Sequence, residues 1–262
     1  MERDAAARTA RQPVAPVSPR ILSVDIRRKS FASRDVLGPL NFTLDAGEIL
    51  AIVGPSGCGK STLLRIVGGL DRDYEGTLAW GDAGGMPRIG TVFQAPRLLP
   101  WRTVRQNLDL VRPPGSGAAA GDALLRTLGL WPARDAFAAN LSVGMARRLA
   151  IARAFVVEPD LVLLDEPFVS LDEAMAAEAR QVLLDAARRR PLSTLLVTHD
   201  LVEAASLADR VLLLSASPAR VIHTLAIPRE LRRAGGSTAI ELAESLRQVV
   251  GDMPPDHFFG GG

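Results

Sequence analysis

The sequence of 262 residues contains one cysteine, two lysines and few aromatic residues, which make up 5% of the chain. A single cysteine excludes an intrachain disulfide framework, so a reducing compartment is the simplest expectation. Positive side chains number 31 and negative side chains 29, which leaves a net charge of only +2. This balance gives little support for the basic face of a dedicated nucleic-acid-binding protein, and we predict no nucleic-acid partner.

The chain also has no uncharged apolar run of the roughly 20 residues that a membrane-spanning helix requires. Residues 1–20 contain arginine and alanine without the apolar segment of a secretory signal, and we expect a disordered tail there. An arginine-rich transit peptide is a weaker alternative, because Glu2 and Asp4 are acidic. Hydrophobic residues still make up 47% of the chain, which is enough to build a full core.

Strand and helix patterns alternate along the rest of the chain. Continuous apolar runs at 49–53 and 161–164 are typical of strands that are buried on both faces. Helical patterns follow these two runs at 61–67 and 172–190. The alternation predicts an α/β fold with a mainly parallel central sheet.

Two parts are expected beside this central sheet. Short strand patterns from Ile21 onward predict an antiparallel β part near the N-terminus, and a helical subdomain is expected at about residues 100–158. We place the main domain at 21–230 and a C-terminal helix with a flexible tail at 231–262. The helix itself is predicted over 238–250.

The segment Gly54–Ser61 matches the phosphate-loop pattern G-x-x-x-x-G-K-[ST] between a buried strand and a helix. Its glycines let backbone N–H groups turn toward phosphate oxygens, and the following helix adds the positive end of its dipole. Lys60 would reach the β- and γ-phosphates, and the Ser61 hydroxyl would bind Mg²⁺. The alternative is a glycine-rich turn without a ligand. The pattern and its context favour a P-loop nucleoside triphosphatase.

A second motif, LVLLDEP at 161–167, places two carboxylates at the end of a predicted buried strand. Asp165 would hold Mg²⁺ through water, and Glu166 would polarise the attacking water as the catalytic base. Phosphoryl transfer depends mainly on positioning and charge compensation, so one oriented carboxylate suffices. A strand that merely ends in an acidic turn is the alternative.

Two further polar residues follow predicted strands. His199 comes after the strand at 194–197, where a contact with the γ-phosphate is expected, although a lone histidine is usually structural. Gln94 follows Val92 and Phe93 and could reach both Mg²⁺ and the attacking water. Neither residue carries weight without the rest of the set.

The motifs occur in a diagnostic order. They are GPSGCGKST at 54–62, VFQ at 92–94, LSVGM at 141–145, LVLLDEP at 161–167, SLD at 170–172 and THD at 198–200. Over roughly residues 21–225 this set resembles the nucleotide-binding subunit of an ATP-binding cassette (ABC) transporter. The resemblance implies an ABC ATPase that binds ATP and Mg²⁺, hydrolyses ATP and closes as a homodimer around two ATP molecules.

The resemblance also implies a role for each motif. Phe31 would stack on adenine, Gln94 would form the Q-loop and His199 would be the switch histidine. The nucleotide-binding residues of the loop are Gly54, Pro55, Ser56, Gly57, Cys58, Gly59, Lys60, Ser61 and Thr62. The signature that caps the partner's ATP is Leu141, Ser142, Val143, Gly144 and Met145. The D-loop is Ser170, Leu171 and Asp172, and the Mg²⁺ ligands are Ser61, Gln94 and Asp165.

A narrower resemblance concerns FQAPRLLPWRTVRQN at 93–107, which looks like the ATPases of nitrate, sulfonate, taurine and pyrimidine-precursor importers. It implies integral membrane permease subunits as partners and, indirectly, a periplasmic or surface solute-binding protein. It also implies a peripheral location on the cytoplasmic face of the bacterial inner membrane. Trp101, with Leu98 and Leu99, would be an exposed anchor for the permease, and core packing of Trp101 is the alternative.

One position departs from the family pattern, because Val143 replaces the first of two glycines after the signature serine. We expect Gly144 to open a helix over 145–157, and the β-branched Val143 to require a different backbone geometry where the partner's nucleotide approaches. Two alternative functions stay open at this point. One is a non-hydrolysing, regulatory cassette, and the other is a cytosolic ABC ATPase without a transport role.

The single cysteine lies inside the phosphate loop. Because Cys58 is close to a helix N-terminus and to Lys60, we expect a thiolate-favouring site that reacts with maleimide. A buried and inert thiol is the alternative.

Overall fold

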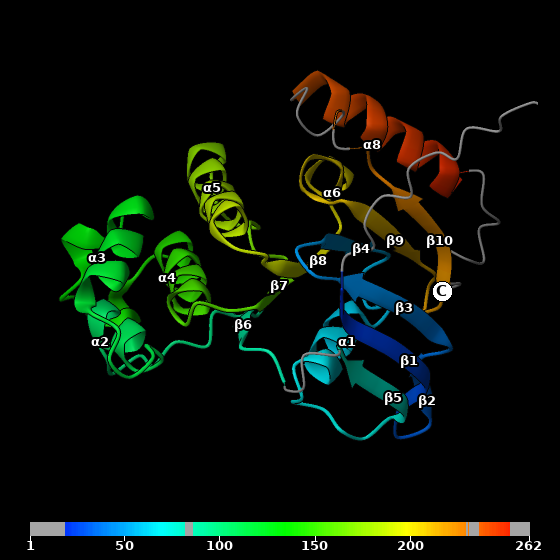
Figure 1. Cartoon of the computed structure of the whole chain (residues 1–262), viewed down its shortest axis with the longest axis horizontal. Helices are drawn as coiled ribbons and strands as arrows, with labels where there is room; N and C mark the ends of the chain where they lie inside the picture. The colour runs from blue at the N-terminus through cyan, green and yellow to red at the C-terminus, as the bar shows by residue number, and fades with distance from the viewer. Residues whose placement is uncertain (1–18, 82–85, 229, 231–235, 252–262) are drawn as a thin grey trace, which may run out of the picture.

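The computed structural model describes residues 19–81, 86–228, 230 and 236–251 (Figure 1). Residues 1–18 of the predicted tail and the end of the chain from residue 252 lie outside the described residues. Arg20 already belongs to the first strand, so the tail expected over residues 1–20 was drawn slightly too long.

Ten strands are found in the described part of the chain: β1 (Arg20–Phe31), β2 (Arg34–Leu37), β3 (Leu40–Asp45), β4 (Ile49–Val53), β5 (Glu75–Trp80), β6 (Ile89–Val92), β7 (Leu161–Asp165), β8 (Ser193–Thr198), β9 (Arg210–Leu214) and β10 (Val221–Ala226). The α-helices are α1 (Lys60–Val67), α2 (Val104–Asp109), α3 (Ala118–Thr127), α4 (Val143–Val156), α5 (Glu173–Arg189), α6 (Leu201–Leu207) and α8 (Gly236–Gly251). Two short 3-10 helices are η1 (Trp131–Ala133) and η2 (Ala138–Asn140).

The central sheet has six strands in the order β10-β9-β4-β8-β7-β6. The pairs from β9 to β6 are parallel, and only β10 runs antiparallel at one edge. Every residue of β4, β7 and β8 is buried, as the continuous apolar runs predict for strands with two covered faces. The prediction of an α/β fold with a mainly parallel sheet is confirmed.

A second sheet is antiparallel and contains β1, β2, β3 and β5. The strand β1 pairs antiparallel with each of β2, β3 and β5. Figure 1 shows this sheet, with α1 beside it, at the opposite end of the molecule from α2 and α3. The N-terminal antiparallel part is therefore present as predicted.

The segment between β6 and β7 is mostly helical and contains α2, α3, η1, η2 and α4. This matches the predicted helical subdomain, which lies to one side of the central sheet in Figure 1. Near the other end of the chain, α8 packs on α6, where Ala205 and Ala243 are both buried. The last helix starts at Gly236 and ends at Gly251, slightly beyond the predicted bounds on both sides.

Alternate residues of the central strands enter different cores. In β7, Leu161 and Leu163 pack with α1 and the antiparallel sheet, whereas Val162 and Leu164 pack with α4 and α5. Burial of both faces fixes the strand register, because a slip by one residue would exchange the two side-chain sets. The positions of the strand ends are therefore well defined, and they carry the polar residues described next.

Candidate nucleotide site

The parallel strands β4, β8, β7 and β6 are neighbours and end at the same edge of the sheet. Their register pairs Val53 with Thr198 and Asp165 with Val197. Ligands of open α/β sheets bind at this carboxyl edge. The residues that follow these strand ends are Gly54 after β4, Gln94 after β6, Glu166 after β7 and His199 after β8.

The phosphate loop connects β4 to α1 and depends on glycine at two positions. Gly57 has φ +76° and Gly59 has φ +120°, both in the region that favours glycine. A side chain at Gly59 would also come within 2.6 Å of Leu37, so β2 packs directly on the loop. The helix that begins at Lys60 directs its unpaired N–H groups toward this loop, which is the geometry of an anion site.

Lys60 is 6% exposed and lies inside the loop. Its Nζ donates hydrogen bonds to the carbonyl oxygens of Gly54, at 2.7 Å, and Pro55, at 2.8 Å. Ser61 is hydrogen-bonded to Asp165. Two of the predicted Mg²⁺ ligands, on α1 and at the end of β7, are thus in contact.

Asp165 is a buried carboxyl at the end of β7. Burial raises its pKa and the charge of Glu166 acts in the same direction, whereas Ser61, Lys60 and Arg147 lower it. A bound cation next to such a buried carboxyl would stabilise its ionised form. Within the described ranges no three His, Cys, Asp or Glu side chains cluster, so a cation here would depend on hydroxyl, amide and phosphate oxygens as well.

Glu166 lies between the Q-loop glutamine and the switch histidine. Gln94 Nε2 donates to Glu166 Oε2 at 3.4 Å, and His199 Nδ1 is 3.2 Å from Glu166 Oε1. Glu166 has φ +48°, a left-handed conformation that an L-residue rarely adopts, and its N–H donates to the Val197 carbonyl. The structure therefore brings together three residues that the sequence predicted from three separate strands.

A buried carboxyl that the sequence did not single out lies behind His199. Thr198 donates a hydrogen bond to Glu203 Oε2, and the Thr198 hydroxyl accepts one from the Asp200 N–H at 3.0 Å. Burial raises the pKa of Glu203 to about 7, despite the hydrogen bond from Thr198. This network fixes the backbone on both sides of the switch histidine, and a glutamate in an amphipathic helix gives no sequence signal for it.

The expectation of a reactive Cys58 is wrong. The side chain is almost fully buried beneath the loop, in the core cluster with Leu214 and Leu37. Burial raises the pKa of the thiol, and the nearby Lys60 charge only partly opposes this effect. Proximity to a helix N-terminus favours a thiolate only where the sulfur remains solvated, so this cysteine acts as a small apolar core residue.

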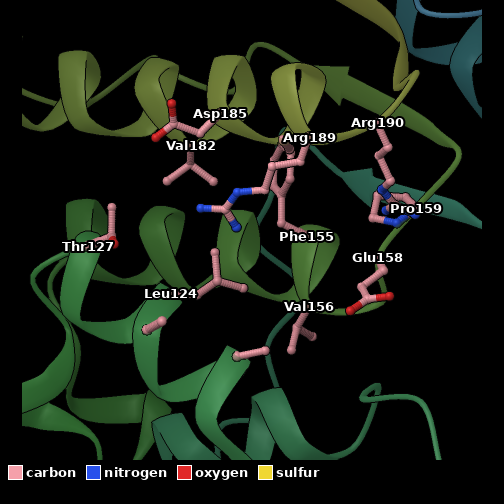
Figure 2. Close-up of a pocket in the computed structure, with 13 residues that line it drawn as sticks. Leu124, Thr127, Phe155, Val156, Glu158, Pro159, Val182, Asp185, Arg189 and Arg190 are labelled. Carbon is pink, nitrogen blue, oxygen red and sulfur yellow. The ribbon is translucent and has the colours of Figure 1, made fainter. Parts of the chain in front are cut away.

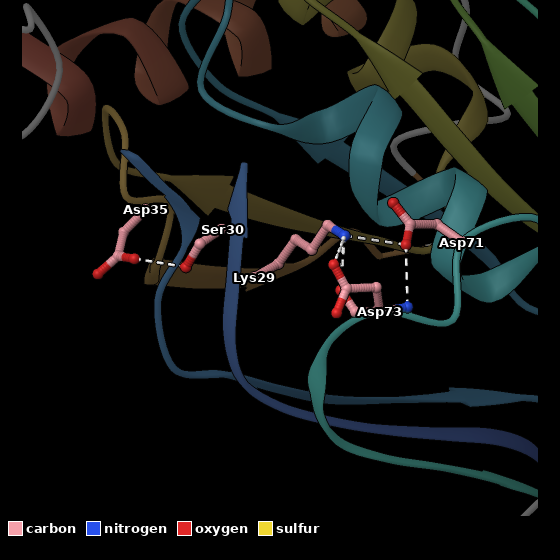
Figure 3. A network of polar contacts seen from close by, with 5 residues as sticks. All are labelled: Lys29, Ser30, Asp35, Asp71 and Asp73. Atoms are coloured by element: carbon pink, nitrogen blue, oxygen red, sulfur yellow. Dashed lines mark hydrogen bonds and ion pairs between the residues drawn. The ribbon is translucent and has the colours of Figure 1, made fainter. Parts of the chain in front are cut away.

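The other lysine of the chain, Lys29, stabilises the end of β1. Lys29 is 2% exposed, and its Nζ is 3.0 Å from Asp71 Oδ1 and 3.3 Å from Asp73 Oδ2 (Figure 3). Burial alone would lower the pKa of Lys29, but the two aspartates outweigh it and raise the pKa. Lys29 Nζ also lies 4.5 Å from the Phe31 ring centroid, a cation–π contact.

The predicted adenine-stacking residue Phe31 lies next to this network. Phe31 is half exposed at the end of β1 and pairs with Arg34 in the turn to β2. The strand β2 that follows this turn packs on the phosphate loop at Gly59 through Val36 and Leu37. An exposed aromatic ring at this place fits the predicted adenine contact.

The signature lies elsewhere in the chain. Ser142 is the N-cap of α4, and its hydroxyl accepts a hydrogen bond from the Met145 N–H at 3.2 Å. The helix begins at Val143, two residues before the predicted start. Val143 is 68% exposed on this first helical turn.

The D-loop lies next to the signature within the same chain. A side chain at Gly144 would meet Leu171 and the Ser170 carbonyl, each at 3.7 Å. Asp172 is the N-cap of α5, accepting from the Met175 N–H at 2.9 Å. Figure 1 shows α4 and α1 as separate helices that do not pack side by side.

A cavity of the described residues lies away from the predicted nucleotide site. It has a volume of about 370 Å³ and lies between α3, the end of α4 and α5, where Figure 2 shows Leu124, Phe155 and Val182 facing one another. None of the predicted site residues lines it. The predicted nucleotide site lies instead at the carboxyl edge of the central sheet.

Trp101 is 68% exposed, so the alternative of core packing is wrong. It precedes α2 in the helical subdomain, and Leu110 and Phe137 of the same subdomain are also exposed. No helix of the described segments combines the length and hydrophobicity needed to cross a bilayer.

Comparison with known proteins agrees with this site. A family model described as "ABC transporter" matches residues 37–169. The chain is 42% identical over 233 residues to the aliphatic sulfonates import ATP-binding protein SsuB 2 of Burkholderia cenocepacia, covering 84% of this chain and 85% of the relative. It is also 42% identical over 238 residues to SsuB of Bacillus licheniformis, covering 87% and 92% of the two chains.

Solved structures give the same assignment. The dimeric structure of MJ0796, a bacterial ABC transporter cassette, matches with a TM-score of 0.70 and 26% identity, over 79% of this chain and 99% of that one. A dimeric post-hydrolysis state of the same cassette, bound to ADP and phosphate, matches with a TM-score of 0.69 and 25% identity, over the same shares of the two chains. The chain therefore belongs to the ABC transporter family, as an ATP-binding subunit that hydrolyses ATP.

Proposed function

We propose that two copies of this chain form the ATP-driven motor of an importer for aliphatic sulfonates. The observation that carries the proposal is the division of the site: one chain brings its phosphate loop and Glu166 to one sheet edge, while its signature is exposed at the start of α4. The names of the relatives support both import and an aliphatic sulfonate as the solute. Nitrate, taurine and pyrimidine precursors are the other solutes of the group that the sequence resembles.

In this proposal the residues of one chain bind the phosphates and activate water. Lys60 leaves its two loop carbonyls to contact the β- and γ-phosphates, and Phe31 stacks on the adenine. Ser61, Gln94 and Asp165 would hold Mg²⁺, which when bound would neutralise phosphate charge. Glu166 orients a water for in-line attack on the γ-phosphorus, so that ADP and inorganic phosphate form.

The contacts of Glu166 support hydrolysis over a purely regulatory cassette. An amide and an imidazole hold its two oxygens in place, which is the orientation that a general base needs. Val143 alone favoured the regulatory alternative, and it lies in an ordinary helical turn. A valine side chain there adds bulk at the partner's phosphate without disturbing the backbone that presents Ser142.

The exposed side chains of the helical subdomain are the proposed permease contact. Trp101 is the largest of them, and an aromatic ring on a polar surface is typical of a protein interface. Docking at this surface would hold the subunit at the cytoplasmic face of the membrane and reach a solute-binding protein only through the permease.

The solute is tested with the full-length chain purified from detergent-solubilised native membranes and reconstituted in vesicles with the membrane protein that accompanies it. We expect aliphatic sulfonate, presented with the binding protein, to stimulate ATP hydrolysis more than nitrate, taurine or a pyrimidine precursor does. Stimulation by one of those solutes instead would refute the sulfonate assignment. Recovery of no membrane protein would refute the importer.

The docking surface is tested by Trp101→Arg, with Ile240→Arg as its matched control. Both side chains are large, apolar and exposed, but Ile240 lies in α8, away from the helical subdomain. We expect Trp101→Arg to lose the membrane protein and Ile240→Arg to retain it. Equal recovery with both variants would remove Trp101 from the interface.

A further inference from the structure

Two arginines of α4 hold the Q-loop at both of its ends. Arg147 Nη1 donates to the Phe93 carbonyl at 2.8 Å, and Arg153 Nη1 donates to the Arg97 carbonyl at 2.8 Å. The two carbonyls lie on either side of Gln94. The helix that supplies both arginines is the one whose first turn carries the signature.

Arg147 is a costly side chain to bury, which argues that its position has a use. It is 5% exposed, and burial lowers its pKa, while the charges of Asp165 and Glu166 oppose that shift. Its Nε has no hydrogen-bond partner among the described residues. The guanidinium is therefore held by one loop carbonyl and by the field of the two carboxylates.

The loop between the two hydrogen bonds is short, and its first and last residues contact each other. Arg97 has φ +47°, and its guanidinium carbon lies 4.2 Å from the Phe93 ring centroid. Segment 93–97 is thus hydrogen-bonded to α4 at both ends, and its two end residues contact each other. If α4 moves while these two hydrogen bonds stay intact, the segment that carries Gln94 moves with it.

We propose that Arg147 and Arg153 couple the Q-loop to the signature helix, so that Gln94 at one ATP and the signature at the other move together. This inference rests on the proposed two-chain site. In this proposal Arg147 is a positioning residue: it holds the loop that carries Gln94, and its charge interacts with Asp165 and Glu166.

The chain offers a control on the same helix. Arg148 Nη1 donates to the Leu128 carbonyl at 2.7 Å, a bond inside the helical subdomain that leaves the Q-loop untouched. Arg148→Met therefore removes an arginine-to-carbonyl bond of the same kind from the neighbouring position. Arg147→Lys keeps the charge but not the planar fork, and tests whether charge alone suffices.

Loop mobility gives a readout that needs no partner, permease or solute. With Cys58→Ser, a nitroxide on Ala95→Cys becomes the only label, and Ala95 is exposed within the Q-loop. We expect Arg147→Met to make the label rotate several-fold faster, Arg153→Met to have a similar effect, and Arg148→Met to have none. Equal label mobility in Arg147→Met and the parent, or an equal rise in Arg148→Met, would overturn the coupling.

Steady-state hydrolysis by the full complex separates positioning from folding. We expect Arg147→Met to lower kcat about tenfold, the factor of one lost charge-assisted hydrogen bond, with KM for ATP nearly unchanged. Arg147→Lys should recover part of kcat. If Arg147→Met does not fold, the Arg147→Lys and Arg153→Met variants decide the question, and wild-type mobility and kcat in both would overturn the proposal.

The outcomes also distinguish this inference from the proposed function. An unchanged label with an intact ATP-dependent dimer would remove only the coupling. A mobilised label with no ATP-dependent dimer would leave the arginine contacts standing and remove the two-chain site.

Discussion

The phosphate loop and the signature differ in how the chain holds them. Lys60 and Asp165 are buried and bonded within one chain, at strand ends whose register is fixed by packing on two faces. Val143 is mostly exposed, and the only side-chain cap of its helix is the Ser142 hydroxyl. In the proposed two-chain site, the first region is one half of the site, and the second is the surface that meets the partner's nucleotide.

The largest expected effect comes from a substitution in the half of the site that contains the phosphate loop and Glu166. Glu166→Gln should lower kcat by about 10²–10⁴, because an amide is a poor general base, while ATP affinity stays within a few-fold. Turnover and equilibrium nucleotide binding measured on the same preparation check this. Glu75→Gln, an exposed carboxylate of the antiparallel sheet, should change neither quantity. Wild-type turnover by Glu166→Gln would show that another group activates the water.

The two lysines sharpen the contrast between binding and folding. Lys60→Ala should weaken ATP binding about 10- to 100-fold, since it removes charge-assisted hydrogen bonds to phosphate. Lys29→Ala should instead lower the melting temperature by a few degrees, because it leaves Asp71 buried without its cation. Calorimetric binding and thermal unfolding of both variants test the distinction, which fails if the two substitutions act alike.

A smaller effect is expected at the exposed half. If the Val143 side chain hinders closure on the partner's phosphate, Val143→Gly should raise kcat of the assembled transporter roughly two- to fivefold, or about 0.4–1 kcal/mol in barrier. Because the backbone at 143 is already helical, ATP affinity of the isolated chain should not change. Equal or lower kcat would mean that the valine is accommodated in the closed state.

The smallest effect concerns Cys58. A buried thiol with a raised pKa should react slowly with maleimide at neutral pH, with little difference between free and nucleotide-bound protein. The rate should rise with pH, as more thiolate forms, and rise sharply on unfolding. Mass spectrometry after timed labelling measures it. Rapid labelling that Mg·ATP blocks would contradict the buried thiol and support an accessible thiolate at Cys58.

Much of the fold and of the first half-site could be predicted from the sequence. The bounds of β4 match the predicted run at 49–53, because a continuous apolar run is a local signal. Gln94 and His199 were predicted from their places after strands, and parallel pairing brings them to Glu166.

What the sequence did not predict depends on tertiary burial. Cys58 has neighbours in sequence that favour a thiolate, yet its side chain is buried in the core cluster that includes Leu214. Arg147 and Glu203 lie in helices where charged residues are usually solvated, and only packing against the Q-loop and Thr198 makes them buried. Burial of an individual polar residue is decided by contacts distant in sequence, which no local pattern contains.

The central claim is that the site is completed by a second copy, and the oligomeric state tests it most directly. Glu166→Gln should sediment as a dimer with ATP and as a monomer with ADP, because only the γ-phosphate charge is surrounded by both chains. Adding Ser142→Arg should return the protein to monomer while each chain still binds ATP. The same measurement on the full complex covers weak association of the isolated subunit. A closed state that forms equally well with ADP, or that survives Ser142→Arg, would contradict the two-chain site.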